Sequence, residues 1–215
     1  MSKSQVLIAG GGPVGLICAY ALARKGVQVT VLDQNSELQD DPRAATTHPA
    51  TLEVLDGLGV IDDVIEQGLV AEKFEFWDRP TGEKIAVFDH AAIAEDTKFP
   101  FVVQCEQFKL AKIFLARLQD QATATVLFDH NVTGIDHGAD GVTVRADTPD
   151  GEKVFEGDWL IGADGGRSVV RKSAGIAFEG FTWPERFLVL STPFDFAAER
   201  GMSFRNYIAD PEEWC

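Results

Sequence analysis

The chain has 215 residues, enough for one large domain or two small ones and for a substantial buried core. Hydrophobic residues make up 45% and charged residues 25%, an ordinary globular composition that excludes a disordered or collagen-like chain. The 34 acidic residues outnumber the 19 basic ones and give a net charge of −15, which argues against binding to nucleic acid or to an anionic membrane. One local patch of backbone N–H groups can still hold a phosphate.

Cysteine usage favours a reducing, cytoplasmic location. The three cysteines, Cys18, Cys105 and Cys215, are too few for a disulfide framework and lack the spacing of zinc ligands. We expect Cys18 and Cys105 to be core residues.

Residues 6–23 are nearly free of charge, which raises the alternative of a membrane span or a signal sequence. The glycines that precede Pro13 would break a spanning helix near its start, and only Lys3 precedes the stretch. We therefore interpret the stretch as a buried strand, a turn and a buried helix, with no membrane partner.

A glycine-rich turn follows the first predicted strand, residues 5–9, and fits the pattern Gly-x-Gly-x-x-Gly. Gly10 lets the chain turn out of the strand, Gly12 lets a pyrophosphate approach the backbone, and Gly15 lets the helix pack on the strand. Pro13 suits the first helical position, where no N–H is needed. The pattern predicts a dinucleotide-binding turn that opens a helix over residues 13–25.

An acid stands at the distance that this turn requires. Gly26 ends the helix, a second buried strand is predicted at 27–32, and Asp33 follows, where a carboxylate that binds the ribose hydroxyls of an adenosine is expected. Strand, helix and acid together favour dinucleotide binding over a simple glycine turn beside a solvent-facing Asp33. The motif alone does not separate NAD from FAD.

The remaining elements are predicted in an interleaved order. Helices are expected at 49–58, 61–67 and 106–119, and a hairpin at 73–77 and 85–88. A three-stranded meander between 126 and 161 returns to the parallel sheet, and further strands are expected at 187–190 and 203–208.

A second motif follows the last strand of that sheet. Asp164 and Gly165 come after an apolar run, and Ser168 is placed to cap the next helix. Arg171 lies one turn later, in reach of Asp164 or of a phosphate. A buried carboxylate beside an arginine can stay charged and accept N–H bonds or order a bound water.

Several other residue types carry weaker signals. The four histidines, His48, His90, His130 and His137, are scattered, so surface or capping roles are favoured over a metal site. No Gly-x-Ser-x-Gly elbow of a hydrolase occurs in the sequence. Phe181, Trp183 and Tyr207 suit packing better than a pocket.

With these two motifs the chain resembles the flavin-dependent aromatic hydroxylases, the single-component FAD monooxygenases of the p-hydroxybenzoate hydroxylase type. The glycine turn with Asp33, where the family usually has Glu, is one fingerprint, and Asp164 to Arg171 matches a second, Asp-Gly-x-x-Ser-x-Val-Arg. Arg43, after Pro42, and Gln104 also look like family positions. Residues 178–180 and the aromatic stretch after them are most similar to hydroxylases of phenolic acids.

The resemblance implies an α/β fold: a Rossmann-like FAD-binding domain with a parallel sheet and an antiparallel β-meander, plus part of an interleaved α+β substrate domain. The FAD-binding domain would comprise residues 1–74 and 104–180, and the substrate domain 75–103 and 181–215. Arg43 would meet the FAD phosphate or ribityl region and Gln104 the ribityl chain. The Asp164–Gly165 segment would serve FAD and the nicotinamide cofactor.

The chemistry that the resemblance implies is hydroxylation of a small phenolic or aromatic substrate by O2, with FAD as cofactor and NAD(P)H as co-substrate, through a flavin C4a-hydroperoxide. No metal is implied, the catalytic acid or base is not identified, and a homodimer is left open. The family's third fingerprint, a Gly-Asp-Ala-Ala-His-like segment, is absent, so we expect a truncated chain or a fragment of a longer enzyme. A non-catalytic FAD- or nucleotide-binding fragment, and an epoxidase, halogenase or isoprenoid reductase of the same fold, remain alternatives.

Overall fold

The computed structural model describes residues 5–40, 44–186 and 188–213. It divides into two compact units, each built from two separated stretches of the chain. Unit 1 comprises residues 1–41 and 108–186, and unit 2 comprises residues 42–107 and 187–215. The predicted division into a FAD-binding and a substrate domain stays a prediction, because compactness alone assigns no function to either unit.

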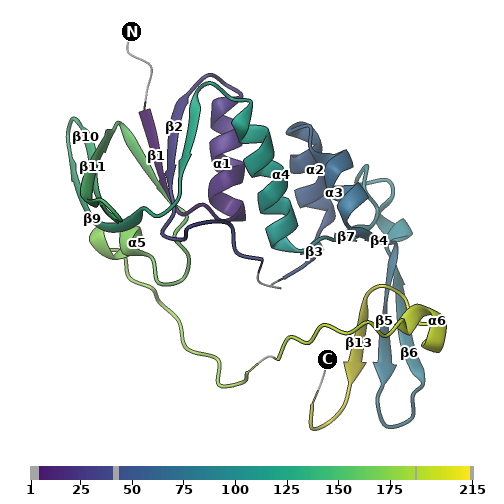
Figure 1. The fold of residues 1–215 in the computed structure, drawn as a ribbon. Helices are drawn as coiled ribbons and strands as arrows, with labels where there is room; N and C mark the ends of the chain where they lie inside the picture. The colour runs from purple at the N-terminus through teal and green to yellow at the C-terminus, as the bar shows by residue number, and fades with distance from the viewer. Residues whose placement is uncertain (1–4, 41–43, 187, 214–215) are drawn as a thin grey trace. The chain divides into compact units, whose positions relative to one another are not determined.

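Unit 1 is an α/β unit with a four-stranded parallel sheet in the order β12-β1-β2-β8 (Figure 1). A three-stranded antiparallel meander, in the order β11-β10-β9, follows β8 in the chain and leads back into β12. The elements of this unit are β1 (Gln5–Ala9), α1 (Pro13–Ala23), β2 (Gln28–Leu32), α4 (Gln107–Gln119, the first residue of which belongs to unit 2), β8 (Ala124–Leu127), β9 (Asn131–Gly138), β10 (Gly141–Thr148), β11 (Gly151–Gly157), β12 (Trp159–Gly162) and α5 (Val169–Ser173).

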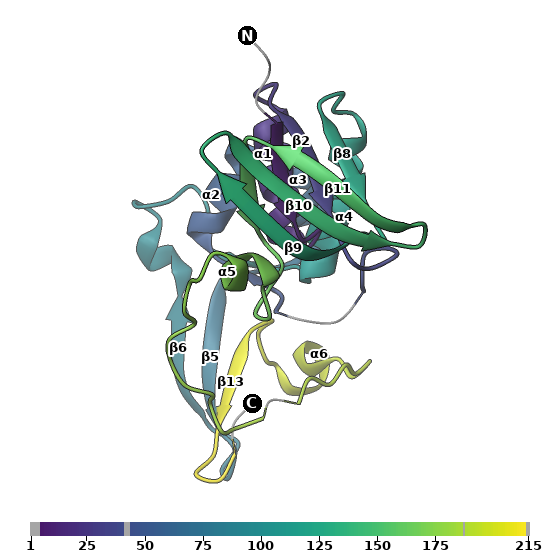
Figure 2. The same cartoon turned by 90° about the vertical axis from the view of Figure 1, so that its left-hand side faces the viewer.

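The parallel sheet of unit 1 is covered on both faces, and Figures 1 and 2 show the resulting layers. Helices α1 and α4 lie on one face, where the rings of Tyr20 and Phe114 meet edge to face at 5.5 Å. The meander lies on the other face, where Leu7 and Ala9 of β1 pack with Val142 and Val144 of β10. Burial on both faces explains why β1 is apolar along its whole length instead of alternating.

Unit 2 contains two small sheets and several short helices. One sheet has the order β3-β7-β4, and the other has the order β13-β5-β6, in which β5 and β6 form an antiparallel hairpin and β13 joins β5 in parallel. The elements are β3 (Thr46–Thr47), α2 (Pro49–Gly57), α3 (Ile61–Gln67), β4 (Leu69–Ala71), β5 (Lys73–Asp78), β6 (Lys84–Asp89), the 3₁₀ helix η1 (His90–Ile93), β7 (Val102–Gln104), α6 (Phe196–Arg200) and β13 (Asn206–Ala209).

Most predicted elements are confirmed to within two residues, and the membrane-span alternative for residues 6–23 is replaced by β1, a turn and α1. The strand expected at 187–190 is wrong, since residues 188–190 have no regular structure and Phe187 lies outside the described residues. The strand expected at 203–208 begins only at Asn206. Helix α6 was not predicted, because it is only five residues long. Asp195 caps its start, and Gly201, at φ +66°, ends it.

Candidate functional site

The glycine turn forms an open cradle between β1 and α1. A Cβ atom on Gly15 would lie 1.9 Å from the Gly10 carbonyl oxygen, so only glycine lets α1 begin this close to the strand end. At Gly12 an added Cβ would meet nothing within 4 Å. Gly12 is the N-cap of α1 and makes no side-chain cap, and Pro13 is the first helical residue. The N-terminus of α1 therefore faces free space beside Gly12, as an anion site requires.

Asp33, directly after β2, is turned toward this cradle. Its Oδ2 accepts a hydrogen bond from the backbone N–H of Gly11 at 2.6 Å. Its Oδ1 accepts hydrogen bonds from the backbone and the side-chain amide of Asn35, at 2.9 and 2.8 Å. The predicted ribose acid thus lies against the glycine turn, with most of its acceptor sites already engaged.

The two sequence motifs meet at one point of the sheet. A Cβ on Gly10, whose φ is +104°, would lie 2.3 Å from the carbonyl oxygen of Ala163, and the Ala163 N–H donates to Ala9 O at 2.8 Å. The chain builds β2 and β8 on one side of β1 and β12 on the other, so the carboxyl ends of β1 and β12 form a topological switch point. Ligands of open α/β sheets bind outside such a point.

Asp164 serves as a second cap of α5. Its Oδ2 accepts hydrogen bonds from the N–H groups of Val169 (2.6 Å) and Val170 (3.1 Å), and its Oδ1 accepts one from Ser168 Oγ (2.6 Å). Ser168 is confirmed as the N-cap, because its Oγ accepts the Arg171 N–H at 2.9 Å. The carboxylate fixes the turn that faces Gly10.

The partners of Arg171 within the described residues do not include Asp164, and its predicted contact with a phosphate stays a prediction. Its Nη1 donates to Gly166 O at 3.0 Å, and its guanidinium lies 4.4 Å from the centre of the Phe178 ring. Its Nε is buried and has no hydrogen-bond partner within the part of the chain that the structure describes. Arg171 therefore supports the Gly165–Gly166 turn, in which Gly165 has φ +78°.

The remaining predicted cofactor residues are not brought to this cradle by any described contact. Gln104 ends β7 in unit 2, where its Oε1 accepts a hydrogen bond from Thr46 Oγ1 at 2.8 Å. Arg43 lies outside the described residues.

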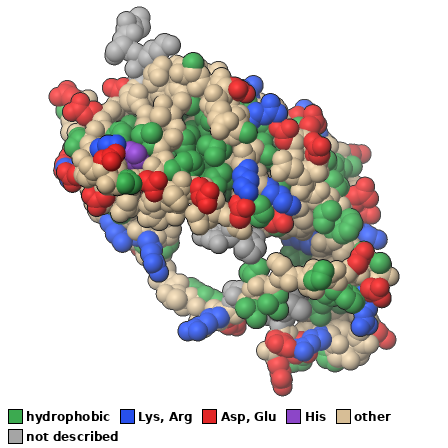
Figure 3. Space-filling model, in the orientation of Figure 1, with side chains coloured by type: hydrophobic (Ala, Val, Ile, Leu, Met, Phe, Trp, Pro, Cys, Tyr) green, Lys and Arg blue, Asp and Glu red, His purple; other side chains and the backbone are tan. Residues whose placement is uncertain are grey.

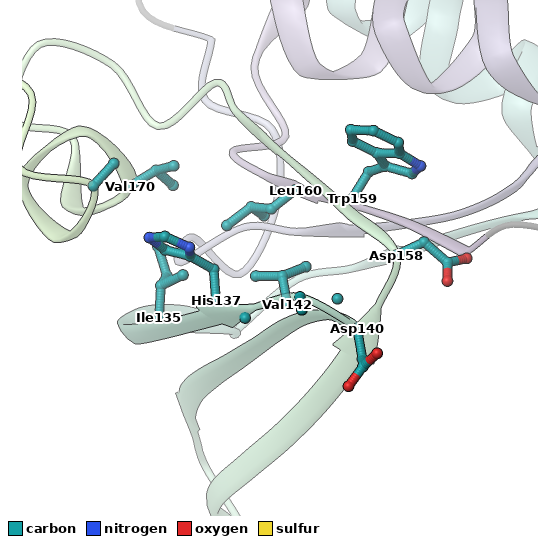
Figure 4. Close-up of a pocket in the computed structure, with 12 residues that line it drawn as sticks. Ile135, His137, Asp140, Val142, Asp158, Trp159, Leu160 and Val170 are labelled. Atoms are coloured by element: carbon teal, nitrogen blue, oxygen red, sulfur yellow. The ribbon is translucent and has the colours of Figure 1, made fainter.

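A cavity of about 680 Å³ lies elsewhere in unit 1, between the meander and the start of β12 (Figure 4). His137, Val142, Leu160 and Val170 line it, and Asp140 belongs to the β9–β10 turn beside it. It borders the amino end of β12, whereas the cradle follows the carboxyl ends of β1 and β12. Ligands of open α/β sheets bind at the carboxyl ends of the strands, so this cavity lies at the other end of β12 from where such a ligand is expected.

Unit 2 has an aromatic surface on the sheet β13-β5-β6. Phe74 stacks on Phe88 and Phe76 on Tyr207, each pair with ring centres 4.9 Å apart. Arg205 lies 5.0 Å from the Phe74 ring centre and donates from Nη2 to the Tyr207 hydroxyl at 2.6 Å. Phe88 is 49% exposed, so the surface is open to solvent. A surface of this kind suits an anionic aromatic molecule.

Two histidines, His48 and His90, also belong to this region of unit 2. The pKa of His48 is lowered from its ordinary value, first by burial and then by the charges of Arg205 and His90. The His90 ring also packs on Phe74, with centres 5.6 Å apart. Within the described ranges no three His, Cys, Asp or Glu side chains gather as a metal site would require.

The opposite side of β5 holds a buried carboxylate that no sequence motif indicates. Glu75 is 1% exposed and accepts hydrogen bonds from Lys84 Nζ (2.8 Å), Trp77 Nε1 (3.2 Å) and the Ser203 N–H (3.3 Å). Burial alone raises the pKa of Glu75, but the hydrogen bonds and charges of its partners outweigh burial and hold that pKa below its ordinary value. The sequence signal that could have pointed to Glu75 is its place between two phenylalanines of the predicted hairpin strand.

Comparison with known proteins decides the family. A family described as "FAD binding domain" matches residues 3–213, nearly the whole chain. The chain belongs to this FAD-binding family. FAD is the family's cofactor, and the fold class predicted from the sequence is confirmed.

The relatives of this FAD-binding chain are named as monooxygenases. It is 31% identical over 210 residues to para-nitrophenol 4-monooxygenase of a Pseudomonas species, covering 98% of the chain and 52% of that protein. It is 37% identical over 195 residues to 6-hydroxy-3-succinoylpyridine 3-monooxygenase HspB of Pseudomonas putida, covering 90% of the chain and 49% of that protein. The chain thus spans about half the length of these relatives.

Solved structures agree with this assignment. p-Nitrophenol 4-monooxygenase PnpA from Pseudomonas putida matches with a TM-score of 0.91 at 32% identity, covering 99% of this chain and 53% of that one. The flavin-dependent monooxygenase PieE, solved with FAD and substrate, matches with a TM-score of 0.76 at 27% identity over 83% of this chain and 33% of its own.

The residues of this FAD-binding chain fit a dinucleotide. The space beside Gly12 admits a diphosphate to the backbone at the start of α1, and Asp33 contacts the same turn through the Gly11 N–H. No side chain of the described residues occupies the position of a Gly12 Cβ.

None of the described helices is both long and apolar enough to cross a bilayer. Acidic and basic side chains are interspersed over the face seen in Figure 3.

Proposed function

We propose that this chain binds FAD at the cradle of Gly10, Gly12, Pro13 and Gly15, and that the whole protein is an NAD(P)H-dependent monooxygenase of a small aromatic substrate. The contact of Gly10 with Ala163 carries the proposal, because it brings the glycine turn and the Asp164–Gly165 turn to one switch point. The names of the relatives support the aromatic substrate class.

Each cradle residue has a proposed task. The N–H groups at the start of α1 would hold the diphosphate, and Asp33 would accept a hydrogen bond from the adenosine ribose. Asp164 and Arg171 keep the second turn in its conformation through the bonds to Val169, Val170 and Gly166. We retain Arg43 and Gln104 as proposed contacts of the phosphate or ribityl region.

Bound FAD would supply the redox chemistry, which is hydride uptake from NAD(P)H and activation of O2. The overall reaction consumes NAD(P)H, a proton, O2 and the arene, and yields NAD(P)⁺, water and the hydroxylated arene. The protein's part is to bind, orient and exclude water. We propose that the aromatic surface of unit 2, where Arg205 lies over Phe74, contacts the ring of an anionic aromatic substrate.

Flavin binding tests the first half of this proposal. The purified chain is incubated with FAD and desalted, and bound flavin is quantified by absorbance. The Gly12→Ala variant is treated in the same way. Stoichiometric flavin in the native chain and little in the variant supports the cradle, whereas equal retention by both would refute it.

Oxidation of NAD(P)H tests the second half. Oxidation that phenols stimulate, with equivalent hydroxylated product, supports a monooxygenase. Tight flavin without such oxidation would support the alternative of a non-catalytic FAD-binding module for this chain.

A further inference from the structure

Asp33 accepts three hydrogen bonds from its own unit. An ionised carboxylate has about four acceptor sites, two on each oxygen. The backbone and side-chain amides of Asn35 occupy both sites of Oδ1, and the Gly11 N–H occupies one site of Oδ2. One acceptor site, on Oδ2, therefore remains among the contacts of the described residues.

The segment that carries Asp33 is held rigidly. The Asp33 carbonyl accepts the N–H of His130 and the Asn35 carbonyl accepts the N–H of Asp129, both at 2.8 Å. The Asp33 N–H donates in turn to Leu127 O at 2.9 Å. These bonds fix the backbone that carries Asp33, so the direction of the carboxylate depends on the bonds of the side chain itself.

The bond from the Asn35 side chain to Asp33 is separate from the backbone bonds that hold this segment. The Asn35 Nδ2 lies 2.8 Å from Oδ1, so it fills a site that an adjacent pair of ribose hydroxyls would otherwise compete for. It also keeps the carboxylate turned with Oδ2 toward Gly11, at the edge of the cradle.

We propose that Asn35 is a positioning residue that restricts Asp33 to one acceptor site, so that the carboxylate holds a single hydroxyl of the adenosine ribose. The inference rests on the proposed placement of FAD at the cradle. It assigns the discrimination between the two neighbouring hydroxyls to the Asn35 side chain and not to the ribose acid itself.

Analogues of FAD that lack the adenosine 2′- or 3′-hydroxyl test the proposal. In the native chain, calorimetry should show that loss of one hydroxyl weakens binding about tenfold or more, as for a hydrogen bond to a charged group, whereas loss of the other changes it less than about twofold. In Asn35→Ala the freed acceptor site lets both hydroxyls contribute, so the affinities for the two analogues should fall by similar factors. Gln34→Ala, at the exposed neighbouring residue, should behave as native.

Equal losses for both analogues in the native chain would overturn the proposal, as would an unchanged asymmetry in Asn35→Ala. A second readout needs no ligand: amide hydrogen exchange of Gly11 should accelerate in Asn35→Ala relative to Leu16, because the carboxylate that Gly11 donates to is no longer fixed. Unchanged protection of Gly11 would refute the positioning role. If the native chain binds neither FAD nor its analogues, the proposed function fails, while exchange at Gly11 still decides the role of Asn35.

Discussion

Gly10 and Ala163 approach so closely that a side chain on Gly10 would place its first carbon 2.3 Å from the Ala163 carbonyl oxygen. These residues are far apart in the sequence but lie at the ends of the paired strands β1 and β12. The contact joins the two motifs of the candidate site, and it can be tested apart from any ligand.

Replacing Gly10 by Ala should destabilise unit 1 through both strain and collision. Gly26 has φ +77° and open space around it, so Gly26→Ala reports strain alone, about 1–2 kcal/mol. Gly10→Ala should cost at least about 1 kcal/mol more, because the carbonyl of Ala163 must move. Urea denaturation of both variants measures the difference, and equal losses would contradict the close contact.

Replacing Gly12 by Ala should separate binding from folding. Gly12 has φ −74°, and a Cβ atom added there would meet no atom within 4 Å, so alanine fits the free protein. The free energy of unfolding should stay the same or rise by up to about 1 kcal/mol, since alanine restricts the unfolded chain. FAD affinity should fall at least about tenfold, because the methyl group occupies the path of the diphosphate. Calorimetric titration and thermal melting give the two values, and a loss of stability would argue that Gly12 is structural.

Replacing Asp164 by Ala should lower stability as well as FAD affinity. The loss of a cap that receives two N–H bonds should cost about 1–2 kcal/mol, and Asp164→Asn, which keeps one acceptor, should cost less. Asp195→Ala is the matched control, because Asp195 caps α6 in unit 2 through the Ala198 N–H at 3.0 Å. It should lower stability without changing FAD binding. If Asp164→Ala retains as much flavin as Asp195→Ala does, Asp164 has no role in cofactor binding.

The buried Glu75 should make stability depend on acid pH. Its folded-state pKa is depressed, so its stabilising effect is present above its unfolded pKa and is lost as pH falls through the folded value. The native chain should therefore lose more stability than Glu75→Gln as pH is lowered below 4.5, the ordinary pKa of a glutamate. At neutral pH, Glu75→Gln should cost about 1–3 kcal/mol, because Lys84 loses its charged partner.

Asp136→Asn provides the comparison for Glu75, since Asp136 is 69% exposed and its pair with Arg145 should contribute little. Denaturation at several pH values measures both variants. Parallel curves for the native chain and Glu75→Gln would show that Glu75 does not carry the acid sensitivity.

Arg205 should control the affinity of unit 2 for phenolates. Arg205→Gln removes the charge that stacks on Phe74 and the bond to Tyr207, so binding of 4-nitrophenolate should weaken about tenfold. Arg79→Gln, at an arginine that is 51% exposed and pairs with Glu213, should leave it unchanged. Equilibrium dialysis of the probe distinguishes the two, and equal binding would remove the aromatic surface from the proposed substrate contact.

Much of the fold followed from local sequence. The apolar run before Gly10, the glycine spacing and Asp33 predicted β1, α1 and β2 because strand, turn and helix there are set by neighbouring residues. The hairpin of β5 and β6 and the helix α4 followed from periodicity for the same reason. These are relationships within about 30 residues of chain.

The tertiary structure decided what depends on contacts between distant segments. The sequence predicts Arg171 in reach of Asp164 or of a phosphate, whereas in the fold the N–H groups of Val169 and Val170 are the partners of the Asp164 carboxylate. Asn35 and Glu75 carried no motif, because an amide beside an acid or an acid between two phenylalanines acquires a role only when a fixed backbone brings donors to it. Sequence thus determined which turn we propose for the dinucleotide, and folding determined how many of the polar groups beside that turn remain free to bind one.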